Sequence, residues 1–138
     1  METHERDAAL NAPTVKVMTV DDHAVFREVA REVVHATMGF EHVGDATSGE
    51  EALALAESLD PDLILIDLRM PGIDGLETAR RFRVSRPDAM TVLISTADFE
   101  SLPDGFATCG AAAFVCKQDF GPATLRRLWA EHHRRSEA

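Results

Sequence analysis

The chain has 138 residues, a length that suits one domain with its own core and is short for two. Its 14 Lys and Arg residues stand against 24 Asp and Glu residues, and the net charge of -10 argues against direct binding to nucleic acid, whose phosphates attract basic surfaces. The two cysteines, Cys109 and Cys116, show no metal-ligand spacing and are too few for a disulfide scaffold, so a cytoplasmic location is expected.

Residues 1–13 are charged and lack the apolar stretch of a signal peptide or a membrane span. We expect them to form a mobile leader, followed by a domain over residues 14–135 and a tail over residues 136–138. No association with a membrane is expected.

An apolar run over residues 15–20 predicts a buried strand, and two acidic residues, Asp21 and Asp22, follow it directly. Apolar residues at helical spacing then predict an amphipathic helix over residues 23–38, which Gly39 ends. The residues expected on its apolar face are Phe26, Val29, Ala30, Val33, Val34 and Thr37.

A second, short strand is predicted over residues 41–46. Ser48 and Glu51 then have the spacing of a capping box at the start of a helix, which Asp60-Pro61 ends. The apolar positions of this helix are Ala52, Leu55, Ala56 and Leu59.

The third strand carries the most informative pattern, because in the segment that starts at residue 62 an apolar run ends on Asp67 and a Pro71-Gly72 breaker follows. This places Asp67 at the carboxyl end of a buried strand, where open α/β sheets hold their reactive groups. Asp74 can cap the next helix, whose apolar positions are Leu76, Ala79 and Phe82.

Two more strands are predicted over residues 90–94 and 112–116, and polar residues follow them directly, Ser95 after the first and Lys117 after the second. Pro122 opens a last helix with one apolar face, formed by Leu125, Leu128, Trp129 and His132.

The segment between these two strands contains Pro103 and Gly105, which are poor residues for a helix interior. We therefore predict at most a short or irregular fourth helix, from about Leu102 to Cys109. Residues 98–110 are expected to be the most mobile internal segment.

Strands and helices alternate, which predicts an α/β fold with a doubly wound, five-stranded parallel sheet and helices on both faces. The carboxyl ends of its strands then bring Asp21, Asp22 and Asp67 together. Two carboxylates about 4 Å apart repel by roughly 4 kcal/mol at an effective dielectric constant near 20. A cation or a bound proton must offset that repulsion, and Mg²⁺ suits an all-oxygen set of ligands. In the plainer alternative, Asp21 and Asp22 only cap the helix that follows.

Ser95 and Lys117 add a hydroxyl and an ammonium group at equivalent strand ends. A carboxylate nucleophile, an acidic metal-binding pair, a hydroxyl and a cation together can position and neutralise a phosphoryl group during its transfer.

On these motifs the chain resembles the receiver domain of two-component response regulators, which has a flavodoxin-like fold, from residue 14 to about 135. The resemblance rests on Asp21-Asp22, on Asp67 with the following segment 70–75, on Ser95, and on Phe114 with Lys117. The residues around the acidic pair and around the lysine resemble those of the subgroup of receivers that precedes LuxR-type helix-turn-helix domains.

The resemblance implies that Asp67 accepts a phosphoryl group from a histidine kinase or a phosphotransfer protein. It implies that Mg²⁺ is held by Asp22, Asp67 and the main-chain carbonyl of Arg69, with Asp21 acting through a bound water. Ser95 would donate a hydrogen bond to the phosphoryl group and Lys117 would pair with it. Phe114 would be the aromatic switch residue, and a homodimer could form on phosphorylation.

One departure from the family pattern is Gln118, because many receivers place a proline after the lysine, with a cis bond. A cis bond without proline costs about 3 kcal/mol, so a trans bond is expected here.

Two other functions would use some of the same residues. A haloacid-dehalogenase-like phosphatase needs a second Asp two residues after its nucleophile, where this chain has Arg69. A receiver that only binds other proteins, and is never phosphorylated, is the other alternative.

Overall fold

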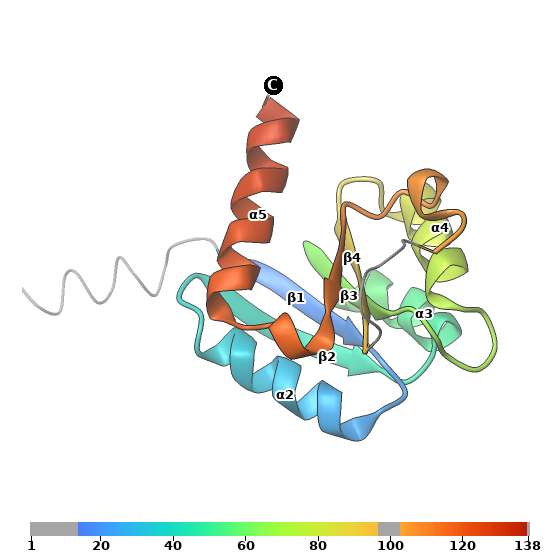
Figure 1. Ribbon diagram of the computed structural model, residues 1–138, viewed down its shortest axis with the longest axis horizontal. Coiled ribbons are helices and arrows are strands. Elements are labelled where there is room, and N and C mark those ends of the chain that lie inside the picture. Colours follow the sequence, from blue (N-terminus) through green and yellow to red (C-terminus); the bar gives the residue numbers. More distant parts are fainter. Residues whose placement is uncertain (1–13, 97–102, 138) are drawn as a thin grey trace, which may run out of the picture.

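Five strands form one parallel sheet in the computed structural model, which describes residues 14–96 and 103–137 (Figure 1). In chain order the strands are β1 (Val15–Val20), β2 (Phe40–Ala46), β3 (Leu63–Asp67), β4 (Met90–Ser95) and β5 (Ala113–Cys116). Their order across the sheet is β2-β1-β3-β4-β5, so the chain winds outward from β1 in both directions. The predicted doubly wound parallel sheet is confirmed.

Helices cover both faces of the sheet, as predicted (Figure 1). One face packs against α2 (Ala24–His35) and α5 (Pro122–Glu137), and the other against α3 (Gly49–Leu59) and α4 (Gly75–Ser85). β3 lies in the middle of the sheet and all its residues are buried, which explains why its sequence is a continuous apolar run and does not alternate.

The predicted helix caps are present. The Ser48 hydroxyl accepts a hydrogen bond from the Glu51 backbone N–H at 3.1 Å, and the Asp74 carboxylate accepts one from the Glu77 backbone N–H at 2.9 Å. Asp60 ends α3 in the left-handed backbone region, at φ 49°. These local interactions fix where α3 and α4 begin and therefore where the loops at the carboxyl end of the sheet lie.

The first helix is shorter than predicted, because α2 ends at His35 and not at residue 38. Gly39 belongs to the turn before β2, where its φ is +89°. Val29 was expected on the apolar face but is 40% exposed, because the face that meets the sheet consists of residues spaced four apart. The buried residues of α2 are Phe26, Ala30 and Val34.

Within residues 103–112, the crossover between β4 and β5 forms only a short 3-10 helix, Phe106–Thr108, which agrees with the predicted short or irregular helix. The segment packs against α4, since a Cβ atom at Gly110 (φ +89°) would lie 2.7 Å from Cδ of Arg83. The mobility predicted for residues 98–110 stays a prediction, and its first part, up to residue 102, lies outside the described residues.

Three smaller expectations complete the fold. The bond between Lys117 and Gln118 is trans, as predicted. None of the helices in the described ranges combines the length and apolar composition that a membrane span requires. The predicted leader over residues 1–13 lies outside the described residues, and the domain bounds of 14–135, with a tail over 136–138, stay a prediction.

Candidate functional site

Two buried carboxylates lie side by side where β1 and β3 end. Val20 of β1 pairs with Ile66 of β3, so the next residue along each chain, Asp21 and Asp67, occupies neighbouring positions at the carboxyl end of the sheet. Asp21 is fully buried and Asp67 is 4% exposed, whereas Asp22 is exposed. The predicted convergence of the three carboxylates is present.

Lys117 and Ser95 reach the same place from the neighbouring strands. Lys117 Nζ lies 2.7 Å from Oδ2 of Asp21 and 3.6 Å from Oδ1 of Asp67. It also lies 4.9 Å from the centre of the Phe26 ring, which holds the ammonium group from the α2 side. Ser95 is buried at the end of β4. The shared pocket is lined by His23, Asp67, Arg69, Ser95, Thr96 and Lys117.

Burial and the neighbouring Asp21 carboxylate raise the pKa of Asp67 from 3.8 to about 6, and Lys117 opposes this shift. Oδ2 of Asp67 is buried and has no hydrogen-bond partner among the described residues. A buried carboxylate oxygen without a partner is costly, because it has lost its hydration without replacement. The site therefore favours a ligand that brings positive charge or a hydrogen-bond donor to this oxygen.

His23 belongs to the same cluster, although the sequence analysis did not select it. Its backbone N–H donates to Oδ1 of Asp21 at 2.8 Å, and its Nδ1 lies 3.0 Å from that oxygen. The same Nδ1 is 3.3 Å from Oδ1 of Asp22 and 3.8 Å from Oδ2 of Asp67. The available signal was its position directly after the acidic pair, at the residue that precedes α2.

The cluster has the dimensions of a metal site. One ligand atom from each of Asp21, Asp22, His23 and Asp67 lies within 4.8 Å of all the others. Together with the unpartnered Oδ2 of Asp67, this arrangement fits a divalent cation. Arg69, whose carbonyl was predicted as a further ligand, lies in the loop that lines the same pocket.

A glycine keeps the loop after Asp67 close to the sheet. A Cβ atom at Gly75 would lie 2.5 Å from the carbonyl oxygen of Asp67 and 2.7 Å from Cα of Leu68, so only glycine allows α4 to start here. The Gly75 N–H donates to the Leu68 carbonyl at 2.9 Å, and the Leu68 N–H donates to the Ile94 carbonyl at 2.8 Å. These contacts fix the backbone on both sides of the Asp67 carboxylate.

Phe114 is a predicted site residue that lies away from the carboxylate cluster and does not line this pocket. It lies on β5, half-buried, on the face of the sheet that α3 and α4 cover. Its ring packs edge-on against Phe106, with 6.0 Å between the ring centres. It therefore connects the sheet to the irregular crossover and not to the carboxylates.

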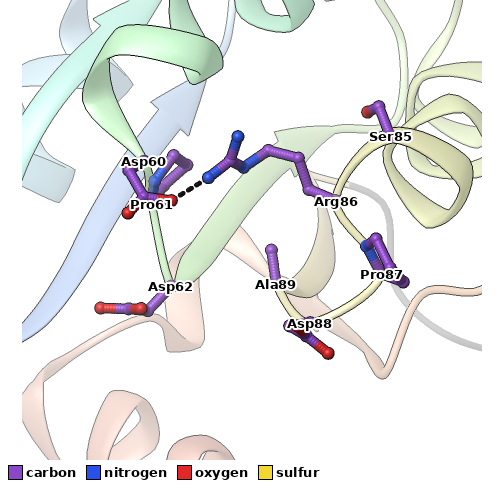
Figure 2. A pocket seen from close by; sticks show the side chains of 8 residues that line it. All are labelled: Asp60, Pro61, Asp62, Ser85, Arg86, Pro87, Asp88 and Ala89. Atoms are coloured by element: carbon purple, nitrogen blue, oxygen red, sulfur yellow. Dashed lines mark hydrogen bonds and ion pairs between the residues drawn. The ribbon is translucent and has the colours of Figure 1, made fainter.

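A second pocket lies at the opposite, amino end of the sheet, between the segments that precede β3 and β4 (Figure 2). Arg86 extends across it to form an ion pair with Asp60, as Figure 2 shows. Lys16 contacts both aspartates: its backbone N–H donates to Oδ2 of Asp62 at 2.9 Å, and its Nζ lies 3.7 Å from Oδ2 of Asp60. Asp60 and Asp62 are thus partnered here, which indicates a structural role.

Comparisons with known proteins agree with this geometry. A family model described as the response regulator receiver domain matches residues 17–128. The chain is 37% identical over 103 residues to response regulator GacA of Pseudomonas aeruginosa, covering 75% of this chain and 48% of that protein. It is 38% identical over 115 residues to the nitrate/nitrite response regulator protein NarL of Escherichia coli, covering 83% and 53%. The chain thus spans about half the length of these curated relatives.

Solved structures give the same result. The signal receiver domain of NarL from Mycobacterium tuberculosis superposes with a TM-score of 0.74 at 32% identity, covering 85% of this chain and 98% of that one. A LuxR-family response regulator from an Aurantimonas species gives 0.70 at 30% identity, covering 83% and 81%. The similarity to LuxR-type regulators predicted from the sequence is confirmed.

Proposed function

Because this chain belongs to the receiver domain family of two-component response regulators, we propose that Asp67 is its phosphoacceptor. The single observation that carries the proposal is Oδ2 of Asp67, a buried carboxylate oxygen without a hydrogen-bond partner among the described residues, in the pocket that Ser95 and Lys117 also line. One oxygen of Asp67 attacks the phosphorus of a phosphohistidine, and an O–P bond forms as the N–P bond breaks. The phosphatase alternative is dropped, because such phosphatases belong to another family and this chain belongs to the receiver family.

The surrounding residues supply charge and orientation. Lys117 lies 3.6 Å from the other oxygen of Asp67 and can follow the developing negative charge on the phosphoryl group. Ser95, buried in the same pocket, donates its hydroxyl to a phosphoryl oxygen. Both groups act as fixed electrostatic partners, so the domain itself catalyses the transfer and the later hydrolysis of its acyl phosphate.

We assign Mg²⁺ to the acidic cluster, held by Asp22, Asp67 and the main-chain carbonyl of Arg69, with Asp21 acting through a bound water. A bound Mg²⁺ would offset the repulsion among these carboxylates and stabilise negative charge on the phosphoryl group. The fit rests on the cluster of ligand atoms and on the unpartnered Oδ2 of Asp67. Lys117 pairs with Oδ2 of Asp21 at 2.7 Å and so holds that carboxylate in place.

Receiver domains work with histidine kinases and phosphotransfer proteins, and we propose such a protein as the phosphoryl donor here. We propose that the reaction takes place in the cytoplasm, because kinases of this kind draw phosphate from ATP. On phosphorylation, Phe114 acts as the switch residue, because its contact with Phe106 couples β5 to the crossover. The rearranged face then pairs two copies of the chain or docks a partner.

Intact-mass measurement after incubation with Mg²⁺ and acetyl phosphate tests the proposal. The wild type should gain one phosphoryl group, and Asp67→Asn should gain none because the nucleophile is lost. Asp62→Asn is the matched control, since Asp62 lies just before β3 while Asp67 ends it, and this variant should label like the wild type.

No added mass on the wild type, or equal labelling of Asp67→Asn, refutes the phosphoacceptor role. The first of these results would favour the alternative of a receiver that only binds other proteins.

A further inference from the structure

The imidazole of His23 stands among the carboxylates at the distances that separate ligands of a single metal ion. Adjacent ligands of an octahedral ion with bonds of about 2.1 Å lie roughly 3.0 Å apart, and ligands of a tetrahedral zinc ion lie roughly 3.3 Å apart. Nδ1 of His23 is 3.0 Å from Oδ1 of Asp21 and 3.3 Å from Oδ1 of Asp22. A nitrogen ligand is therefore already placed beside the carboxylate oxygens.

The imidazole is not needed to satisfy Asp21. Oδ1 of Asp21 already accepts the backbone N–H of His23 at 2.8 Å, and Oδ2 is paired with Lys117 at 2.7 Å. The His23 side chain is 65% exposed, so an ion from solvent can reach Nδ1. Nδ1 also makes a hydrogen bond to Oδ1 of Asp21 at 3.0 Å, and an ion bound at Nδ1 would take the place of the proton in that contact.

An independent observation also points to a ligand in this place. Asp67 is 4% exposed, and its buried Oδ2 has no hydrogen-bond partner in the described part of the chain. That oxygen lies 3.8 Å from Nδ1 of His23, on the same side of the cluster. A cation between Nδ1 and Oδ2 would satisfy the stranded oxygen and bring the imidazole into its coordination shell.

We propose that His23 is a metal ligand, which makes this centre a mixed nitrogen and oxygen site selective for Mn²⁺, Ni²⁺ and Zn²⁺ over Mg²⁺. The inference rests on the proposed function, because it concerns the ion of the same site. An all-oxygen shell suits Mg²⁺, whereas an imidazole adds affinity for transition ions, in the order Mn²⁺ below Ni²⁺. These ions then compete with Mg²⁺ for the phosphoacceptor centre.

Pulsed electron paramagnetic resonance of the Mn²⁺-loaded protein detects an imidazole bound to the ion through its nitrogen coupling. The wild type should show the coupling of a directly bound nitrogen, and histidine labelled with ¹⁵N should change it in the wild type without any substitution. His23→Gln should lose the coupling. His35→Gln is the control, because His35 is exposed at the far end of α2, and it should keep the coupling.

Calorimetric titration gives a second readout. The ratio of the Mg²⁺ to the Ni²⁺ dissociation constant should be about tenfold or more higher in the wild type than in His23→Gln, since only the Ni²⁺ complex gains strongly from imidazole. An absent nitrogen coupling in the Mn²⁺-loaded wild type, or equal ratios in the two proteins, would overturn the proposal. Phosphoryl labelling of the wild type in Mg²⁺ is measured separately. An absence of labelling would contradict the proposed function and not the role of His23.

Discussion

Each end of the sheet holds aspartates and one of the chain's two lysines, yet the two ends are neutralised differently. At the amino end, Asp60 has both Arg86 and Lys16, and Asp62 accepts a backbone N–H. At the carboxyl end, three carboxylates share Lys117 and the imidazole of His23, and Oδ2 of Asp67 has no hydrogen-bond partner among the described residues.

The difference shows that one end of the sheet is suited to a reaction because its negative charge is not fully neutralised. The same residue types give stability where Asp60 and Asp62 are partnered and give reactivity where negative charge is left in excess. Burial increases the contrast, because the Lys117 side chain is 11% exposed and that of Lys16 is 38% exposed. Substitutions at the carboxyl end should therefore change chemistry and metal binding, and those at the amino end should change stability alone.

Lys117→Ala should have the largest effect, slowing phosphoryl labelling of Asp67 by about a hundredfold, because a buried cation aimed at developing charge is lost. Labelling rates from acetyl phosphate at saturating Mg²⁺ measure this. The matched variant is Lys16→Ala, which removes the lysine at the other end and should label at the rate of the wild type. Similar rates for both variants would show that the two ends do not differ as described.

Asp67→Asn should stabilise the protein in the absence of divalent ions. The folded-state pKa of Asp67 is raised from 3.8 to about 6, so its ionisation opposes folding in full above that range and ceases to do so as the pH falls toward 3.8. The gain at a pH of about 7 should be on the order of 1–3 kcal/mol. Urea unfolding at several pH values checks this, and a gain that stays constant down to a pH of about 4 contradicts the assignment.

Mg²⁺ should raise the free energy of unfolding by about 1.4 kcal/mol at an ion concentration ten times its dissociation constant, since it binds the folded cluster alone. Asp22→Ala should reduce this gain, because it removes a ligand, whereas Asp88→Ala at the amino end should keep it. Thermal melting with and without the ion, with a chelator as reference, measures both. A melting midpoint of the wild type that Mg²⁺ does not move refutes the metal site.

Arg86→Ala should have the smallest effect, lowering the free energy of unfolding by about 0.5–1 kcal/mol with no change in labelling. It removes the ion pair with the exposed Asp60, and pairs of this kind contribute little. Urea unfolding and labelling on the same sample decide the point. Slower labelling would mean that the amino end is coupled to the phosphoacceptor site.

Much of the fold follows from local patterns in the sequence. The apolar run up to Asp67, followed by Pro71-Gly72, predicts both the central strand and its reactive end, because a strand buried on both faces must be apolar throughout. The Ser48 and Asp74 caps are equally local, since each side chain binds a backbone N–H three residues on.

What the sequence missed depends on side-chain direction and on neighbours that are distant in the chain. His23 looks like the first residue of a helix, and only its position before α2 turns the ring toward Asp21 and Asp22. The end of α2 was misplaced because Thr37 continues the helical spacing, although the chain has already turned at Ala36 toward β2.

Identification of the modified residue tests the central claim most directly. Borohydride cleaves an aspartyl phosphate and reduces that side chain to homoserine, which tandem mass spectrometry can place in the sequence. After treatment with acetyl phosphate and Mg²⁺, we predict homoserine at position 67 and unmodified aspartate at positions 21, 22, 60 and 62. Reduction at any of these other positions, or at none in the chain, would contradict the assignment of Asp67 as the phosphoacceptor.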